Sequence, residues 1–344
     1  MDTIGEKVMK ILFLGPQKST FVKHDYEILS KSNTINPIDT VIGGGVGGAV
    51  NLLKCTLRSI WGVLRSDVVF SWFADYTSFV PVLLAKLLGK RSLVVAGGFD
   101  VGHQPQLNYG AIMRPLRWFC VRNSFMMADD VIAVSEYAKS ALLRLTSIKP
   151  QKITVIHNCI KSSDYLIDDI NKAERKHFIT ISQSHSVSEL ILKGGDVFIE
   201  AARNNPDNKF IFAGLRGKAL DKAKEWASGL QNIEIIPGPL SLHDDILPLY
   251  RTAFGYMQLS VEESFGVALV EAMKCGCLPI VSPNAALPEV AGEYGVIVSN
   301  DIEINKAIET GTKIDNNKRI EISKFADRYD IAFRETKLLG LLNK

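Results

Sequence analysis

Short runs of aliphatic residues alternate with segments of helical periodicity along the first half of the chain. The strand-like runs span residues 11–14, 40–42, 68–70, 92–96, 131–134 and 153–156. Helical patterns occupy residues 77–88, 114–127 and 136–145. The strand-like runs are β-branched and alternate little with polar residues, as expected for strands that are covered on both faces. Alternation of strand and helix predicts a parallel, doubly wound sheet.

A polar stretch over residues 161–176, rich in Asp, Lys and Ser, interrupts this pattern and indicates a linker. A second series of strand-like runs follows at 178–181, 210–213, 233–236, 255–259, 278–281 and 296–298. Helical patterns separate these runs at 196–203, 219–227, 244–250 and 267–274. The sequence therefore predicts two Rossmann-like α/β domains, at 1–160 and 177–318, and a helical tail at 319–344.

Length and composition agree with this division. A chain of 344 residues exceeds what one core usually supports, and 47% hydrophobic with 22% charged residues is typical of globular proteins. Five cysteines without regular spacing predict no disulfide framework and a reducing, cytoplasmic environment. We expect no signal peptide, and the most apolar span, residues 68–88, contains Asp75 and Lys86 and does not resemble a transmembrane helix.

The charge is unevenly distributed. Residues 1–160 contain 18 Lys and Arg against 11 Asp and Glu, a balance of +7, whereas the remainder has 22 against 26, a balance of −4. A basic first half suggests an anionic partner, such as a phosphorylated acceptor, a membrane surface or nucleic acid. The alternative is a chance scatter of charges over solvated faces.

One helical segment, residues 50–65, combines apolar and basic residues in a regular pattern. Its apolar side is formed by Leu53, Leu57, Ile60, Trp61 and Leu64. Lys54, Arg58 and Arg65 follow an adjacent edge, and Arg114, Arg117 and Arg122 add charge in the same half. This pattern is typical of a helix that lies on an anionic membrane. The alternative is a helix that packs its apolar face into the core and leaves the basic edge solvated.

The glycine-rich segment Gly43-Gly-Gly-Val-Gly-Gly48 fits the G-x-G-x-x-G pattern of dinucleotide-binding proteins. It follows the second strand-like run rather than the first, and no acidic residue ends the next run. A loop that admits a ligand near its backbone amides fits better. A NAD- or nucleotide-binding regulator remains the alternative function of a different class.

Two glutamates, Glu263 and Glu271, stand eight residues apart in the otherwise apolar segment 261–280. A strand-like run precedes Glu263, and a helix is expected from Gly266. The end of a parallel strand that leads into a helix N-terminus is where α/β folds bind ligands and where free N–H groups attract phosphate. A carboxylate can accept hydrogen bonds from neighbouring hydroxyls. We therefore expect a sugar at Glu263, a diphosphate at the helix start and a ribose at Glu271. The alternative is a capping acid and a surface glutamate.

The segment Glu263-Ser-Phe-Gly-x4-Glu271 resembles the E-x7-E motif of the retaining GT-B glycosyltransferases of family GT4, also called glycosyltransferase group 1. Neighbouring segments agree, at 193–201, 212–214, 233–238, 275–283 and 288–290. The resemblance is strong over residues 179–298 and weaker before them. It implies a GT-B fold, with two Rossmann-like domains that face each other across a cleft and a C-terminal helix that crosses back to the first.

The resemblance also implies a function. The chain would move a hexose from a UDP- or GDP-sugar to a hydroxyl acceptor, with retention, in cell-surface polysaccharide or glycolipid synthesis. A lipid-linked acceptor and a cytoplasmic, peripheral membrane location fit this expectation, and no cofactor, obligate metal or nucleic-acid partner is expected. An epimerase of nucleotide-sugars on the same two-domain plan is a further alternative.

Residue roles follow from the same resemblance. Lys193 would neutralise the departing diphosphate, Glu263 would contact the donor sugar and Glu271 the ribose. The donor side would also include Ser264, Phe265, Gly266, Val267 and Arg216.

Two departures from the family pattern affect these roles. The arginine that usually precedes the lysine is missing from residues 182–190, so phosphate binding would rely on Lys193 and the helix amides, with Arg216 or Lys218 as a candidate addition. The usual glycine pair after the first strand is replaced by Gly15-Pro16. In the first half, Asp100 and His103 follow a strand and two glycines, and either can orient the acceptor hydroxyl or accept its proton. Gly15 is assigned to the same acceptor side.

Overall fold

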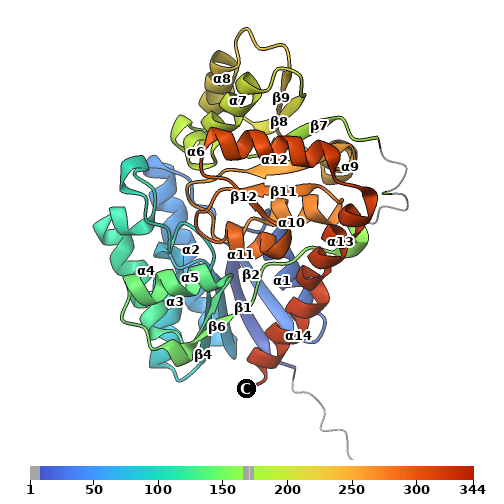
Figure 1. Ribbon diagram of the computed structural model, residues 1–344. Helices are drawn as coiled ribbons and strands as arrows, with labels where there is room; N and C mark the ends of the chain where they lie inside the picture. Colours follow the sequence, from blue (N-terminus) through green and yellow to red (C-terminus); the bar gives the residue numbers. More distant parts are fainter. Residues whose placement is uncertain (1–7, 166–169, 171–173) are drawn as a thin grey trace, which may run out of the picture. The chain divides into compact units, whose positions relative to one another are not determined.

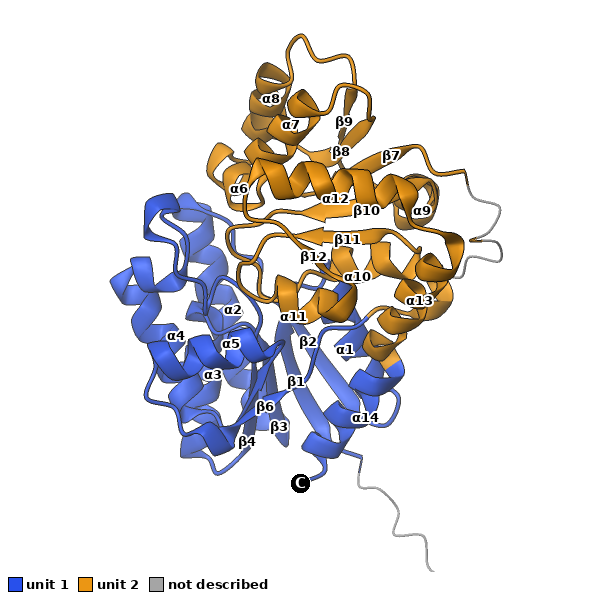
Figure 2. Ribbon diagram, in the orientation of Figure 1, with its two compact units in different colours: residues 1–159, 332–344 blue, residues 160–331 orange. Residues whose placement is uncertain are grey.

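The computed structural model describes residues 8–165, 170 and 174–344, and Figure 1 shows its helices and strands. The chain forms two compact units, Met1–Cys159 with Ala332–Lys344 and Ile160–Ile331 (Figure 2). Each is built around one parallel sheet, which confirms the predicted pair of Rossmann-like domains. Much of the expected linker, residues 166–169 and 171–173, lies outside the described residues.

Unit 1 contains a six-stranded parallel sheet in the order β2-β1-β3-β4-β5-β6. Its strands are β1 (Lys10–Gly15), β2 (Thr34–Asp39), β3 (Val68–Trp72), β4 (Arg91–Ala96), β5 (Asp130–Ala133) and β6 (Ile153–Val155). The strand order reverses between β1 and β3, so the switch point of this sheet lies at their carboxyl ends.

The second strand is not where the sequence pattern places it. We expected residues 40–42, but β2 covers Thr34–Asp39, with Asn36 and Pro37 inside it. That dipeptide reads as a turn. It is tolerated because β2 is an edge strand that pairs only with β1, and a proline there loses no ladder hydrogen bond on its open side.

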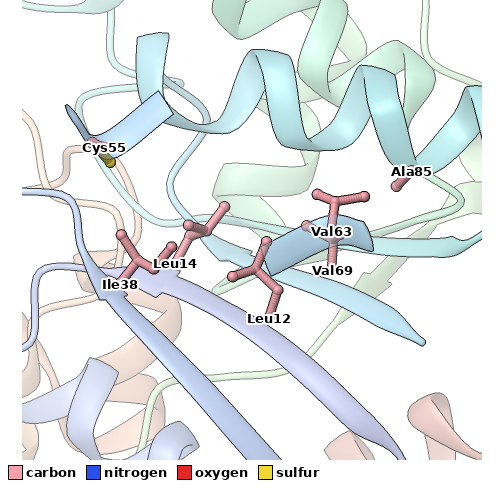
Figure 3. Packing of buried hydrophobic residues seen from close by; sticks show 7 residues of the cluster. All are labelled: Leu12, Leu14, Ile38, Cys55, Val63, Val69 and Ala85. Atoms are coloured by element: carbon pink, nitrogen blue, oxygen red, sulfur yellow. The ribbon is translucent and has the colours of Figure 1, made fainter. Parts of the chain in front are cut away.

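Helices flank the sheet of unit 1. They are α1 (Thr20–Ser30), α2 (Gly45–Arg65), α3 (Tyr76–Leu87), α4 (Pro115–Met127), α5 (Glu136–Leu145) and α14 (Ile331–Leu342). Part of the core lies between α2, α3 and the sheet, and Figure 3 shows its residues Leu12, Leu14, Ile38, Cys55, Val63, Val69 and Ala85.

Unit 2 contains a second six-stranded parallel sheet, in the order β12-β11-β10-β7-β8-β9. Its strands are β7 (His177–Ile181), β8 (Phe210–Leu215), β9 (Ile233–Pro237), β10 (Ala253–Gln258), β11 (Leu278–Val281) and β12 (Val296–Ile297). Its helices are α6 (Val187–Leu192), α7 (Gly195–Asn204), α8 (Gly217–Trp226), α9 (Leu247–Arg251), α10 (Val267–Lys274), α11 (Leu287–Ala291), α12 (Asp301–Lys313) and α13 (Asn316–Ala326). Here the strand order reverses between β7 and β10.

The predicted helical tail is two helices rather than one. A short 3-10 turn over Asp327–Tyr329 ends α13, and only α14 joins unit 1. Arg334 of α14 fixes this return because its guanidinium binds both carboxylate oxygens of Asp25, at 2.5 and 2.6 Å. Asp25 also accepts a hydrogen bond from Trp72 Nε1 at 2.9 Å. Removal of either residue from a fully buried, bidentate ion pair leaves the other charge unpaired in the core, which is strongly destabilising.

Candidate active site

The loop that contains Lys193 is held against the end of β10. Gly194 has φ +71°, and a Cβ there would lie 2.1 Å from the carbonyl oxygen of Leu259. The N–H of Val261 donates a hydrogen bond to the carbonyl of Leu192 at 2.8 Å. Only glycine permits this close approach of two backbones. The glycines after Lys193 therefore place its side chain beside the loop that follows β10.

Lys193 and Glu263 form an ion pair at this point. Lys193 Nζ lies 2.6 Å from Glu263 Oε2, and the two side chains are 36% and 17% exposed. Lys193 follows β7 through α6, and Glu263 follows β10, so the pair stands by the switch point of the unit 2 sheet. That is where ligands bind in doubly wound folds.

Gln258, the last residue of β10, supports Glu263. Its Nε2 donates to Glu263 Oε2 at 3.0 Å, and the side chain is 7% exposed. Gln258 Oε1 and Ser260 Oγ are buried and have no hydrogen-bond partner within the part of the chain that the structure describes. Buried polar atoms normally pair, so both stand out as unsatisfied groups at and just beyond the end of β10. The sequence reasoning missed Gln258, although a polar residue that ends an apolar strand is a usable signal.

The start of α10 lies next to this group. Gly266 precedes the helix with φ +91°, and a Cβ at this position would lie 3.1 Å from Gln258 Oε1. No side chain caps the helix, so its first N–H groups, from Val267 onward, can bind an anion. Ser264 and Phe265 are buried, and the Phe265 ring packs edge-on against Tyr329 at 5.3 Å. The Phe265 side chain thus belongs to the core, and only its backbone is suited to contact a ligand.

Glu271 has aromatic partners that were not foreseen. Tyr165 donates its hydroxyl hydrogen to Glu271 Oε1 at 2.8 Å, and the Tyr250 hydroxyl lies 3.4 Å from Oε2. Burial raises the pKa of the Glu271 carboxyl above its ordinary value, and the bonds from the two tyrosines oppose this shift. A carboxylate has about four acceptor positions. A ribose at Glu271 would therefore have to share this carboxylate with Tyr165.

Arg216 stands beside the loop from which the expected arginine is missing. Its N–H donates to the carbonyl of Ser184 at 3.0 Å, in the segment between β7 and α6. Its Nε is buried and makes no hydrogen bond with any described residue. Lys218 is exposed. Of the two candidates, Arg216 is the one in direct contact with this loop.

In unit 1, Asp100 is bound by the backbone around it. Its Oδ1 accepts the N–H groups of Gly97 and Gly98 at 3.2 and 2.9 Å, and its Oδ2 accepts that of Ala74 at 3.2 Å. The residue is 2% exposed, and burial raises its carboxyl pKa to about 6. These bonds join the loops after β3 and β4, which is a structural task. His103 is exposed.

The switch point of unit 1 lies between β1 and β3, and Gly15 ends β1 there. A Cβ on Gly15 would lie 2.9 Å from Val22 and 3.0 Å from Trp72, so no larger residue fits. Phe73, directly after β3, has a φ of +64°. Positive φ is unusual for an aromatic residue and tends to occur at functional sites. No local sequence signal marks Phe73, because its backbone conformation is imposed by the fold.

The glycine-rich segment begins a helix elsewhere in unit 1. Gly44 caps α2, and the segment follows β2, at the edge of the sheet. Dinucleotide-binding folds place such a loop after the first strand, at the switch point. The geometry around Gly43–Gly48 therefore does not match a NAD site.

Two families of known proteins match the chain. Residues 170–327 match the glycosyl transferases group 1, and residues 47–164 match Glycosyltransferase Family 4. The chain is a glycosyltransferase, and its residues 170–327 belong to group 1. This membership agrees with the E-x7-E spacing of Glu263 and Glu271 and with the position of Lys193.

Curated relatives agree with this family. The phosphatidylinositol N-acetylglucosaminyltransferase GPI3 subunit of Saccharomyces cerevisiae is 23% identical over 218 residues, which cover 58% of this chain and 46% of that protein. A GDP-mannose:cellobiosyl-diphosphopolyprenol alpha-mannosyltransferase of Xanthomonas campestris is 28% identical over 258 residues, covering 71% of this chain and 63% of the relative. The chain thus spans less than two thirds of the length of either relative.

A solved structure shows the same fold. HepE of Anabaena, crystallised in complex with UDP and glucose, superposes with a TM-score of 0.73 at 15% identity, covering 98% of this chain and 100% of that one. This glycosyltransferase therefore has the GT-B fold that the sequence predicts. Within the described residues, none of its helices has the length and apolar character needed to cross a membrane.

Proposed function

We propose that this glycosyltransferase moves a hexose from a nucleoside diphosphate sugar to a hydroxyl acceptor with retention of anomeric configuration. The observation that carries the proposal is the Lys193–Glu263 pair at the switch point of unit 2, beside the unpaired polar atoms of Gln258 and Ser260. Together they offer a cation, a carboxylate and neutral polar groups at one point, which matches a diphosphate linked to a polyhydroxylated sugar.

Charge drives the proposed chemistry. The diphosphate gains negative charge as the bond to the sugar breaks, and groups that are already aimed at that charge lower the barrier. Lys193, the N–H groups at the start of α10 and Arg216 provide positive charge or donors. Glu263 holds Lys193 in place and is free to accept a hydroxyl of the sugar when the lysine turns to the phosphate. No step needs a metal ion in this scheme.

The proposed donor is a UDP- or GDP-sugar, and the proposed acceptor is a lipid-linked hydroxyl compound of a surface polysaccharide or glycolipid. The printed names of the relatives support this, because one names GDP-mannose and a diphosphopolyprenol and another names phosphatidylinositol. We assign the acceptor side to unit 1, at Gly15, Phe73 and His103. Asp100 shapes this side by holding the loops after β3 and β4. The proposed location is the cytoplasmic face of a membrane.

The test is a transfer assay with UDP-glucose, UDP-N-acetylglucosamine and GDP-mannose, each with a polyprenyl-diphosphate-linked saccharide. Release of UDP or GDP that requires the acceptor, and an α-linked product by proton NMR, would support the proposal. Activity should survive EDTA. Conversion of the donor sugar to its epimer without acceptor would instead identify an epimerase. Loss of transfer in EDTA with recovery in Mg²⁺ would contradict the role given to Lys193.

A further inference from the structure

Tyr165 ends a short 3-10 turn, Ser162–Tyr165, which is fastened to the segment after α13. The N–H of Ser162 donates a hydrogen bond to Asp330 Oδ2 at 2.9 Å. The turn and the segment to which it is bound both belong to unit 2. Tyr165 itself is 3% exposed, so the anchored turn and the protein packed around the ring fix its position.

The Tyr165 hydroxyl is directed at a carboxylate on α10. It donates to Glu271 Oε1 at 2.8 Å, the usual length of an O–H···O hydrogen bond. Burial and the nearby charge of Glu271 raise the pKa of the Tyr165 hydroxyl above its ordinary value, so the hydroxyl keeps its proton. In this pair Tyr165 is therefore the donor and Glu271 the acceptor.

The two tyrosines leave part of the Glu271 carboxylate for a ligand. A carboxylate offers about four acceptor positions. Tyr165 takes one on Oε1, and the Tyr250 hydroxyl, 3.4 Å from Oε2, also donates to the carbonyl of Ala268 at 3.3 Å. Both tyrosines are buried, whereas Glu271 is partly exposed. About two acceptor positions remain, one on each oxygen, which is the number that two vicinal hydroxyls require.

The charge of Glu271 has no cation beside it. Among the described residues, no Lys, Arg or His forms an ion pair with Glu271, and the groups that lower its carboxyl pKa are the two tyrosine hydroxyls. A carboxylate without a cation repels a phosphate group, and it forms strong hydrogen bonds with neutral hydroxyl donors. The surroundings of Glu271 therefore favour hydroxyls over phosphates.

The position of Glu271 on α10 indicates which hydroxyls these are. Glu271 stands about one turn after Val267, the first residue of the helix. Side chains of a helix lean toward its N-terminus, so Glu271 extends toward the N–H groups that we propose bind the diphosphate. In a nucleoside diphosphate the ribose is joined directly to that group. Vicinal hydroxyls beside the diphosphate are therefore those of the ribose.

We propose that Tyr165 is a positioning residue that sets the Glu271 carboxylate to accept the 2′- and 3′-hydroxyls of the donor ribose together, and thereby makes the enzyme selective for ribonucleotides. The inference rests on the proposed function, because it requires a nucleoside diphosphate sugar as donor. The alternative is that Tyr165 competes with the ribose for Glu271. It fits less well, since a buried ring on an anchored turn has no free path by which to leave when a ligand arrives.

The test is isothermal titration calorimetry of the full chain with UDP, GDP and their 2′-deoxy and 3′-deoxy counterparts. The wild type should bind the ribonucleotide of its preferred base at least about tenfold more tightly than either deoxy form, the effect of one lost hydrogen bond to a charged group. Tyr165→Phe removes only the hydroxyl. It should weaken ribonucleotide binding about tenfold and deoxyribonucleotide binding by less than about threefold, so most of the discrimination is lost.

Tyr329→Phe is the matched control. Tyr329 is also 3% exposed, and its hydroxyl donates to the carbonyl of Val290 at 3.2 Å, so the variant likewise removes one buried hydroxyl from unit 2. It should discriminate between the nucleotides as the wild type does. In a Glu271→Ala background, Tyr165→Phe should cause no further loss of discrimination, because the acceptor through which Tyr165 acts is absent.

Equal discrimination by the wild type and Tyr165→Phe would overturn the inference and leave Tyr165 as a packing residue. Tighter ribonucleotide binding by Tyr165→Phe would also overturn it, because Tyr165 would then be a competitor of the ribose. A wild type that binds a ribonucleotide and its deoxy forms equally would overturn it without any variant, so the inference stays testable even if Tyr165→Phe does not fold. Failure of the proposed function is distinct: the wild type would bind neither UDP nor GDP, and both proposals would fall.

Discussion

The loop after β4 in unit 1 and the loop after β10 in unit 2 both leave the carboxyl edge of a six-stranded parallel sheet, and both carry a carboxylate. Asp100, in the first loop, is 2% exposed and accepts three backbone N–H groups. Glu263, in the second, is 17% exposed and is held by the side chains of Lys193 and Gln258. Backbone donors are fixed, whereas side-chain donors can turn to a ligand.

The strand order explains the difference. Strand β10 borders β7, where the order of the unit 2 sheet reverses, and the connections on either side of that point run apart. Strand β4 lies between β3 and β5, inside the regular part of its sheet. An acidic residue after a strand is thus held by side chains next to the switch point and by backbone N–H groups away from it.

The largest expected effect is on catalysis. Lys193→Ala should lower kcat roughly 10²–10³-fold, because the leaving diphosphate loses a charge contact in the transition state. Tm should change little, since the ion pair with Glu263 is partly exposed. The measurement is steady-state kinetics, with the exposed Lys218→Ala as the matched control. A kcat close to that of the wild type would show that another group stabilises the leaving diphosphate, and Arg216 is the first candidate.

The second prediction separates the two carboxylates by stability. Asp100→Ala leaves three buried N–H groups unpaired and should lower the free energy of unfolding by about 2 kcal/mol. Glu263→Ala should lower it by less than about 1 kcal/mol while abolishing most transfer activity. Urea denaturation of both variants measures the contrast. If Asp100→Ala keeps full stability yet loses turnover, Asp100 acts in the reaction rather than in holding the loops. That result would contradict the contrast drawn between Asp100 and Glu263.

The third prediction concerns pH. Burial raises the folded-state pKa of Asp100 to about 6, above its ordinary value of 3.8. The folded state then binds this proton more tightly than the unfolded state. The stabilisation is complete below the ordinary pKa and is lost as pH rises through about 6. The free energy of unfolding of the wild type should therefore fall between pH 4 and pH 6 by more than that of Asp100→Asn. If the free energy of unfolding changes equally with pH in the wild type and in Asp100→Asn, the raised pKa of Asp100 is ruled out.

The smallest predicted effect is at Gln258. Gln258→Leu removes the hydrogen bond to Glu263 and should reduce kcat/KM about tenfold, the usual cost of a hydrogen bond to a charged group. The exposed Gln231→Leu is the control and should behave like wild type. If Gln258→Leu keeps full kcat/KM, Glu263 needs no support from the strand, and the loop after β10 is positioned by its backbone alone.

Much of the fold follows from the sequence because buried parallel strands are nearly continuous aliphatic runs. Residues 92–96 and 210–213 predict β4 and β8 almost to the residue. Strand β2 was not predicted, because its dipeptide Asn36-Pro37 resembles a turn and is tolerated in a strand only at the edge of a sheet. Helix α1 was not foreseen, since its buried residues include the polar His24 and Asp25. Asp25 is neutralised in the core by Arg334, which is distant in sequence.

The candidate site could be predicted only where its parts are close in sequence. The spacing of Glu263 and Glu271 is visible in one segment, whereas the Tyr165–Glu271 bond joins residues 106 positions apart. The family resemblance implied that Lys193 and Glu263 serve the same donor site, but it did not imply their ion pair. The hydrogen bond from Gln258 to Glu263 needed the structure of β10 and the loop after it. For Asp100, the sequence shows an acidic residue that follows two glycines. It does not show that the N–H groups of these glycines donate hydrogen bonds to the Asp100 carboxylate.

The central claim is that Lys193, after α6, and the loop after β10 together bind a nucleoside diphosphate sugar. Its most direct test is the thermal stability of wild type and Lys193→Ala with UDP, GDP, UDP-glucose, GDP-mannose and NAD. A uridine or guanosine diphosphate ligand at ~100 times its Kd should stabilise the wild type by about 2.7 kcal/mol and the variant by much less. NAD should have no effect. Stabilisation by NAD, with none by any UDP or GDP ligand, would contradict the account.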